Sequence, residues 1–151
     1  QEKIYSILDT KDELRPYYIF QKVKKLEDYL SQKDSQNFLK AYKRINSILI
    51  ETPQNASINK SLIKKKEEMV LFNRIFEMKN LLMNQKEKNI SEFSENLILL
   101  NKFSSLIDNF FDKVQVNSSD KKLKDNRLNI LLMCKKIFQE ICNFSKILNT
   151  K

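Results

Sequence analysis

The sequence predicts an all-α fold, a single bundle of about five to six helices. The 151 residues contain no glycine and only two prolines, whereas sheets with tight hairpins usually need glycine in their turns. Apolar residues recur at steps of three and four along most of the chain, which is the period of amphipathic helices. We therefore expect one helical domain over residues 16–151, preceded by a linker or the tail of another element over residues 1–15.

The first two expected helices are separated by a short polar break. Pro16 suits the first turn of a helix that runs to about residue 31. Residues 31–35 predict a turn, in which Asp34 or Ser35 would be the N-cap of a second helix over about 36–50. That helix should end before Pro53, because the residue preceding a proline avoids helical dihedral angles.

A loop is expected over residues 54–60, followed by a long helix over 62–84. Residues 85–89 are polar and indicate a turn, and Ser91 is a candidate cap for the next helix. That helix leads into the most informative stretch of the chain.

This stretch is an expected helical hairpin. The apolar stripe of its first helix ends near Val114, and residues 116–120 interrupt the period with turn and N-cap residues. Its second helix should extend from about Asp120 to Leu148. The basic residues near its tip are Lys113, Lys121, Lys122, Lys124 and Arg127. An apolar hairpin with a basic tip is consistent with an anion-binding element.

The charge of the chain suits an anionic partner such as nucleic acid. The net charge is +9 and the sequence pI is near 9.5. Lysine outnumbers arginine 24 to 4, however, and the coding bias of an AT-rich genome would give this composition without any function. Lys40, Lys43 and Arg44 share one helical face. Residues 64–66 are three lysines at the start of a helix, where they oppose the helix dipole and gain nothing locally.

The sequence lacks the residues that several kinds of catalytic and binding site need. It has no histidine, the commonest general base and transition-metal ligand, and no glycine for a phosphate-cradling loop. Cys134 and Cys142 lie eight residues apart on one expected helix, about 12 Å along its axis, which is too far for a disulfide. We expect them to be small buried residues in a reducing compartment. We expect no catalytic centre and no metal site.

The chain has no candidate membrane segment. No run approaches the ~18 apolar residues of a membrane span, so we expect a soluble chain with no membrane partner. It begins with glutamine, and no signal-peptide pattern follows. We take it to be a piece of a longer protein.

Two interpretations of the role of Arg127 remain open. Its guanidinium could contact a phosphate or a base, or it could pair with Asp112 across the hairpin and lock the loop. We favour the pairing. Phe110 and Phe111 fall on the apolar stripe, so we expect both in the core, with Asp112 orienting a nearby cation.

Three segments, in order along the chain, carry a family resemblance. Residues 110–131 read FFDKVQVNSSDKKLKDNRLNIL. They resemble the pattern FFD-x-V-x-V…(D/E)-x-x-L-(R/K)-x-N-R-L-x-L-L near the C-terminus of the bacterial glycyl-tRNA synthetase beta subunit. Residues 41–49 are similar to that family's A-x-K-R-(V/I)-x-N-I-L segment, and residues 143–147 resemble its ending, D-(I/F)-S-K-(I/L). Lys124 stands where the family usually has arginine, which keeps a charge for phosphate but loses the fork geometry.

The resemblance implies an anticodon-binding domain of the DALR type, from the beta subunit of a cytoplasmic alpha2/beta2 enzyme. The implied partners are the anticodon stem-loop of tRNA(Gly) and the alpha subunit. The domain itself would need no cofactor, because ATP and Mg would belong to the catalytic alpha subunit. The candidate tRNA-binding residues are Lys40, Lys43, Arg44, Lys113, Lys121, Lys122, Lys124, Asn126 and Arg127.

Alternative functions remain at this point. One is a helical protein–protein interaction module, which an exposed apolar patch on the folded bundle would favour. Another is the corresponding domain of an arginyl-tRNA synthetase. An independent enzyme is a more distant alternative. A steep loss of RNA binding with salt, together with dependence on the anticodon, would favour the tRNA-binding function.

Overall fold

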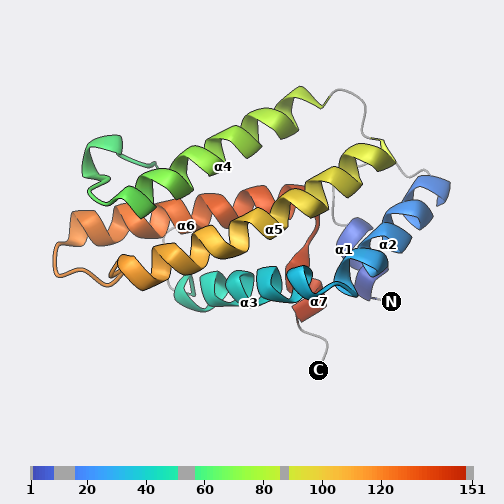
Figure 1. The fold of residues 1–151 in the computed structure, drawn as a ribbon, viewed down its shortest axis with the longest axis horizontal. Coiled ribbons are helices and arrows are strands. Elements are labelled where there is room, and N and C mark those ends of the chain that lie inside the picture. The colour runs from blue at the N-terminus through green and yellow to red at the C-terminus, as the bar shows by residue number, and fades with distance from the viewer. Residues whose placement is uncertain (1, 9–15, 51–56, 86–88, 149–151) are drawn as a thin grey trace.

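The regular elements of the structure, a computed structural model, are all helical in the residues that it describes, which are 2–8, 16–50, 57–85 and 89–148 (Figure 1). They are α1 (Glu2–Leu8), α2 (Pro16–Leu30), α3 (Lys33–Ile48), the 3-10 turn η1 (Lys60–Leu62), α4 (Lys66–Asn84), α5 (Ile90–Lys113), α6 (Lys121–Ile141) and α7 (Phe144–Leu148). The all-α prediction is confirmed. None of the described residues has a positive φ, so their turns do not require glycine.

The long helix α5 lies at the centre of the bundle. It packs against α2, α3, α4 and α6, and α4, α5 and α6 extend along the long axis of the molecule (Figure 1). The turn that joins α5 to α6 lies at one end of this axis, whereas α2 lies towards the other. Helix α5 is therefore the element that the other long helices share as a neighbour.

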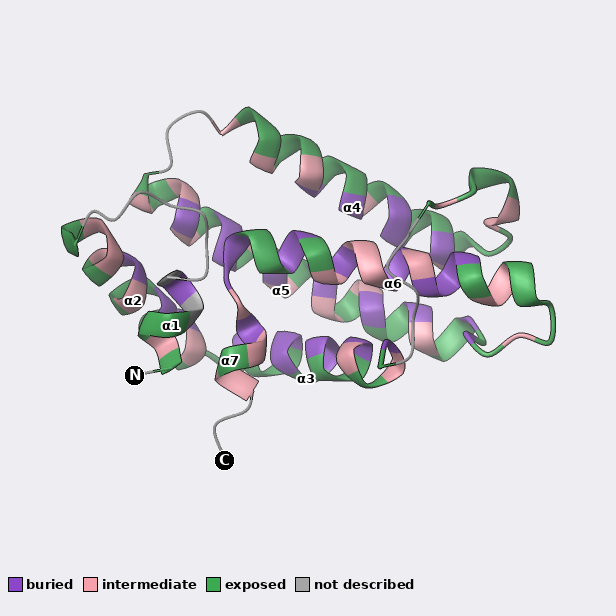
Figure 2. Ribbon diagram, turned by 180° about the vertical axis from the view of Figure 1, so that it is seen from behind, coloured by how far each residue is buried: buried purple, intermediate pink, exposed green. Residues whose placement is uncertain are grey.

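The sequence of α5 explains its position. Asn89 caps the helix, since its Oδ1 accepts a hydrogen bond from the Glu92 N–H at 2.9 Å and Glu92 Oε2 accepts one from the Asn89 N–H at 3.4 Å. The expected cap, Ser91, lies inside the first turn instead. The buried side chains of α5 recur at helical spacing (Figure 2): Phe93, Asn96, Leu97, Leu100, Phe103, Ile107 and Phe110. This stripe is what the sequence period predicted.

Aromatic rings fill the centre of the core. Phe138 of α6 makes edge-to-face contacts with Phe38, Tyr42 and Phe103, with ring centroids 5.0–6.2 Å apart. Phe144 of α7 packs on Phe38 and Tyr42 in the same way. All five residues have an exposed fraction of 0%. Such pairs stabilise a core beyond the area that they bury, and here they join α3, α5, α6 and α7.

Two helix starts differ from the expected ones. Helix α3 begins at Lys33 after an extended Gln32, so Asp34 and Ser35 both lie within the first turn and neither is the N-cap. Ser35 is buried, and its Oγ donates to the Gln32 carbonyl at 2.6 Å. Helix α4 begins at Lys66 rather than at residue 62, because residues 60–62 form η1. The expected break at Pro53 lies outside the described residues.

The helix expected over residues 120–148 is divided in two. Cys142 is extended, with φ −161° and ψ 143°, and it ends α6. The chain then turns so that Phe144 enters the core, and Ser145 Oγ lies 3.0 Å from Tyr42 Oη. Tertiary packing of Phe144 therefore outweighs the continuous helical period.

Helix α1 belongs to the packed part of the structure. It lies against α2 and α7, and Ile7 is only 1% exposed. Residues 1–15 were expected to be a tail or linker. Within them, residues 2–8 contribute a helix to the core, and 9–15 lie outside the described residues. None of the described helices has the length and apolar character needed to cross a membrane.

Candidate nucleic-acid interface

The expected helical hairpin is present as α5 and α6. Val114 and Val116 are 2% and 5% exposed and anchor the connecting turn in the core. Asp120 caps α6, as its Oδ1 accepts hydrogen bonds from the N–H groups of Lys122 at 2.9 Å and Leu123 at 3.3 Å. The tip residues Lys113, Lys121 and Lys122 are exposed, and Lys124 is half-buried. The tip is therefore both ordered by its cap and basic.

Asn126 connects this hairpin to the segment before α4. Its Oδ1 accepts a hydrogen bond from the Asn59 N–H at 2.7 Å, and its Nδ2 donates to the Asn59 carbonyl at 3.1 Å. Asn126 is only 5% exposed. Asn129 adds a further link, since its Nδ2 donates to the Ser57 carbonyl at 2.9 Å. Asn126 was expected at the RNA-contacting surface, but its amide is buried and used to hold two chain segments together.

Arg127 makes an internal ion pair with Glu68 of α4. Its Nε lies 2.5 Å from Glu68 Oε1, and the two side chains are 8% and 1% exposed. Its Nη1 also donates to the Gln115 carbonyl in the turn at 2.9 Å. The prediction of an internal pair is confirmed, whereas the predicted partner, Asp112, is wrong. Asp112 is exposed, and α4 supplies the carboxylate that the sequence pattern did not reveal.

Glu68 is held by donors on both of its oxygens. Its Oε2 accepts hydrogen bonds from the backbone N–H groups of Lys64 and Lys65, at 2.7 and 2.9 Å. Burial by itself raises the pKa of this carboxyl, but the hydrogen bonds from Arg127 and from the two N–H groups outweigh it and lower the pKa below the ordinary value. Glu68 is therefore a charged residue in the core, at the point where η1, α4 and α6 meet.

The basic face of α3 lies beside the end of α5. Lys40, Lys43 and Arg44 are all exposed, as the spacing predicted. The Arg44 guanidinium carbon lies 4.2 Å from the centroid of the Phe111 ring, which is within cation–π range. Phe110 is fully buried, as expected, but Phe111 is only half-buried and carries Arg44 on its ring. Arg44 therefore joins the basic face of α3 to the end of α5 in the hairpin.

The structure also brings lysines to the hairpin tip that were not among the expected site residues. Helix α6 packs against η1 and α4, and Lys65 Nζ donates a hydrogen bond to the Lys113 carbonyl at the end of α5. We call this part of the molecule the basic end, and its lysines are Lys60, Lys64, Lys65, Lys66, Lys113, Lys121, Lys122 and Lys124. The sequence signal that could have revealed these lysines is the run of three at residues 64–66. Positive charge at the start of a helix opposes the helix dipole, so the run gives the helix itself no advantage.

Other functional chemistry is not found in the described part of the chain. Cys134 and Cys142 are both buried, and neither forms a disulfide, as expected. Burial raises the pKa of the Cys134 thiol, which makes it unreactive. The described residues contain no group of three or more Cys, Asp or Glu side chains that could hold a metal ion.

Comparison with known proteins defines the class of this domain. Residues 38–147 match the DALR anticodon binding domain family, a range that runs from α3 through the hairpin to α7. The chain belongs to this family.

The relatives by sequence agree with the resemblance found in the motifs. The chain is 39% identical over 133 residues to the glycine–tRNA ligase beta subunit of Buchnera aphidicola subsp. Acyrthosiphon pisum (strain Tuc7), covering 84% of the chain and 18% of that protein. It is 32% identical over 135 residues to that of Thermodesulfovibrio yellowstonii, covering 89% and 19%. For Sulfurihydrogenibium sp., identity is 29% over 145 residues, covering 96% and 21%. The chain thus spans about a fifth of the length of these relatives.

Proposed function

We propose that this domain binds the anticodon stem-loop of tRNA(Gly) as part of a glycine–tRNA ligase beta subunit in the cytoplasm. The observation that carries the proposal is the family match, which spans most of α3 and the whole hairpin, together with beta-subunit relatives that align over most of the chain. Glycine activation, with ATP and Mg, would take place in a partner alpha subunit of an alpha2/beta2 enzyme. This domain would position the tRNA.

The exposed cations are the proposed contacts to RNA. Seven of the nine expected residues remain candidates, and of these all but the half-buried Lys124 are exposed: Lys40, Lys43, Arg44, Lys113, Lys121, Lys122 and Lys124. The lysines would supply phosphate contacts that weaken with salt. Arg44 combines an exposed guanidinium with an aromatic support, an arrangement suited to an unpaired base or a phosphate. Asn126 and Arg127 would act instead by fixing the shape of the hairpin.

Binding to matched RNA hairpins tests this function. The chain would be titrated with the anticodon stem-loop of a glycine tRNA at two salt concentrations, beside a stem-loop altered only in its anticodon bases. We expect tighter binding of the unaltered stem-loop at both salt concentrations. If the two RNAs bind equally and both lose affinity as salt rises, the binding is due only to a basic surface, and anticodon recognition is contradicted.

An apolar stripe on α4 supports a second function, docking to another protein surface. Met69, Phe76 and Met83 recur every seven residues and are 39%, 52% and 71% exposed. They are separated by the exposed Asn73 and Asn80. Because the relatives are several times longer than this chain, we propose that the remainder of the parent polypeptide covers this stripe.

Hydrogen exchange distinguishes a covered stripe from a free one. Amide exchange in α4 would be compared between this chain and the full-length parent protein, with α6 as the internal reference. Slower exchange of α4 in the parent supports docking. Equal exchange in the two proteins contradicts it and leaves the tRNA-binding proposal unaffected.

A further inference from the structure

The basic end combines two segments that are far apart in sequence. One is the run from η1 into α4, residues 57–68, and the other is the hairpin tip, residues 112–127. Apart from the Glu68–Arg127 pair, these segments hold eight lysines and four carboxylates, those of Glu67, Asp112, Asp120 and Asp125. The excess of positive charge is therefore a property of the folded end, shared between the two segments.

Three cross-links fix the two segments against each other. They are the paired hydrogen bonds of Asn126 with Asn59, the ion pair of Arg127 with Glu68, and the bond from Lys65 Nζ to the Lys113 carbonyl. Two of the three include a buried side chain. The lysines on either side are thus carried by one rigid scaffold, which reduces the entropy lost when they bind a ligand.

Helix dipoles add to the potential at this end. Both α4 and α6 begin here, so the positive ends of two helices lie beside the lysines (Figure 1). The negative end of α5 also lies here, and Lys65 donates to its last carbonyl. Asp120 occupies the first N–H groups of α6, and Glu68 occupies those before α4. The cationic side chains that this end exposes are therefore those of lysines.

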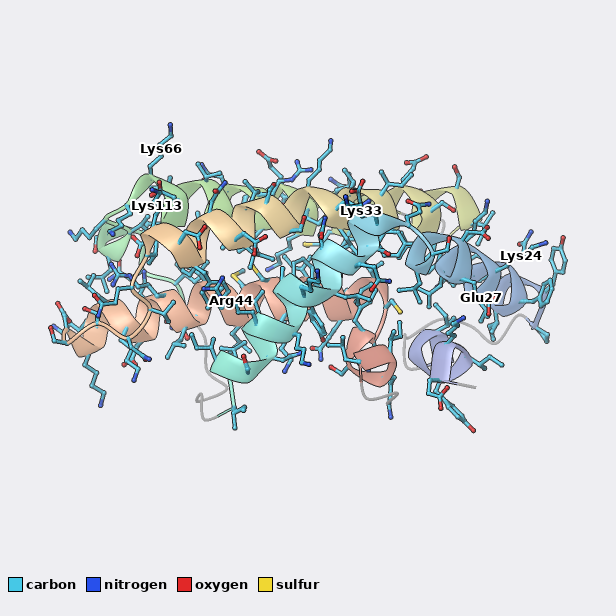
Figure 3. The ribbon with its side chains drawn as sticks, turned by 60° about the horizontal axis from the view of Figure 1, so that its bottom comes forward. Lys24, Glu27, Lys33, Arg44, Lys66 and Lys113 are labelled. Carbon is cyan, nitrogen blue, oxygen red and sulfur yellow. The ribbon has the colours of Figure 1, made fainter. Side chains whose placement is uncertain are left out.

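From these observations we propose that Lys60, Lys64 and Lys66 form one continuous phosphate-binding surface with the hairpin-tip lysines, which grips the RNA backbone next to the anticodon loop. All three side chains are exposed, and Lys60 is held above the Phe72 ring at 5.3 Å. Figure 3 shows Lys66 and Lys113 together at this end, with Lys66 extending outward. This inference rests on the proposed function and adds a second contact segment to it.

Three variants with equal charge changes test the proposal. The first is Lys60→Gln, Lys64→Gln and Lys66→Gln. The second neutralises the hairpin tip through Lys121→Gln, Lys122→Gln and Lys124→Gln. The control is Lys24→Gln, Lys25→Gln and Lys33→Gln, which removes three exposed lysines from α2 and from the start of α3, away from the basic end (Figure 3). Each variant would be titrated with the glycine anticodon stem-loop over a range of salt, after a thermal melt has shown that it folds.

The salt slope separates the outcomes. We expect the first variant to bind roughly tenfold more weakly, with the slope of log K against log salt reduced by about two to three, since each lost phosphate contact removes about one unit. The control should keep the slope of the unaltered chain. If the first variant behaves like the control while the hairpin-tip variant loses affinity, the inference is overturned and the proposed function stands. If the unaltered chain binds no RNA even at low salt, both are overturned.

Discussion

Arg127 lies within the hairpin and Arg44 packs on it from α3, and their surroundings differ in burial. The Arg127 side chain is 8% exposed and is bonded to Glu68 and to the Gln115 carbonyl. Arg44 is exposed and rests on the Phe111 ring. An arginine in the first setting cannot reach a phosphate without leaving a carboxylate unpaired, whereas one in the second can bind RNA and keep its support. Arg127 therefore holds the hairpin in place, whereas Arg44 presents a positive charge to solvent.

The largest effect is expected from Arg127→Met. It leaves the buried Glu68 carboxylate without its cation, and removing one partner of a buried ion pair typically costs about 3–5 kcal/mol. Urea unfolding followed by circular dichroism measures this loss. The double variant Arg127→Met with Glu68→Gln should lose less than the sum of the two single variants. A cost below about 1 kcal/mol for Arg127→Met would mean that the pair behaves like a surface salt bridge.

Replacement of Asn126 should cost less. Asn126→Ala removes two hydrogen bonds between a buried side chain and the backbone of Asn59, and such a bond contributes about 0.5–1.5 kcal/mol. The matched control is Asn109→Ala, at an exposed position of α5. In the same unfolding assay the control should change stability by less than about 0.5 kcal/mol. Equal effects of the two substitutions would contradict the linking role of Asn126.

The hairpin could be predicted from sequence because its signals are local. The stripe of α5, the turn residues and the Asp120 cap all lie within a few turns of one another, and each follows from helix geometry. The same holds for the exposed face of α3. Helix α4 could not be delimited in this way, since η1 replaces its expected first turn.

The polar contacts that hold the hairpin could not be predicted. Arg127 and Glu68 are 59 positions apart, and Asn126 and Asn59 are 67 apart. A helical period states which face of α6 is buried, but it does not state which side chain of α4 or η1 will face it. The nearest carboxylate in sequence, Asp112, was therefore a reasonable but wrong partner for Arg127. The hairpin-tip lysines of the basic end were predicted, whereas the contribution of Lys60 and of residues 64–66 escaped prediction for the same reason.

Acid should weaken the fold through Glu68. Its pKa in the folded chain is lower than 4.5, the ordinary value that a glutamate has in the unfolded chain. The stabilisation is therefore complete above that unfolded pKa and is lost as the pH falls through the folded pKa. Urea midpoints measured from pH 7 down to below pH 4 should fall, and they should fall less in Glu68→Gln. If the variant shows the same pH dependence as the unaltered chain, the acid sensitivity arises from other carboxylates.

The smallest effect on stability is expected at Arg44. An exposed cation–π contact contributes about 0.5–1 kcal/mol, so Arg44→Gln should leave the urea midpoint almost unchanged. RNA affinity should fall in this variant, because the exposed cation and its planar fork are both lost. Arg44→Lys retains the charge and should recover the salt-dependent part of binding alone. Arg44→Gln should therefore change RNA affinity more than stability, whereas Arg127→Met should act mainly on stability. If Arg44→Gln were as destabilising as Arg127→Met, the exposed stack would be part of the scaffold, and the division between the two arginines would not hold.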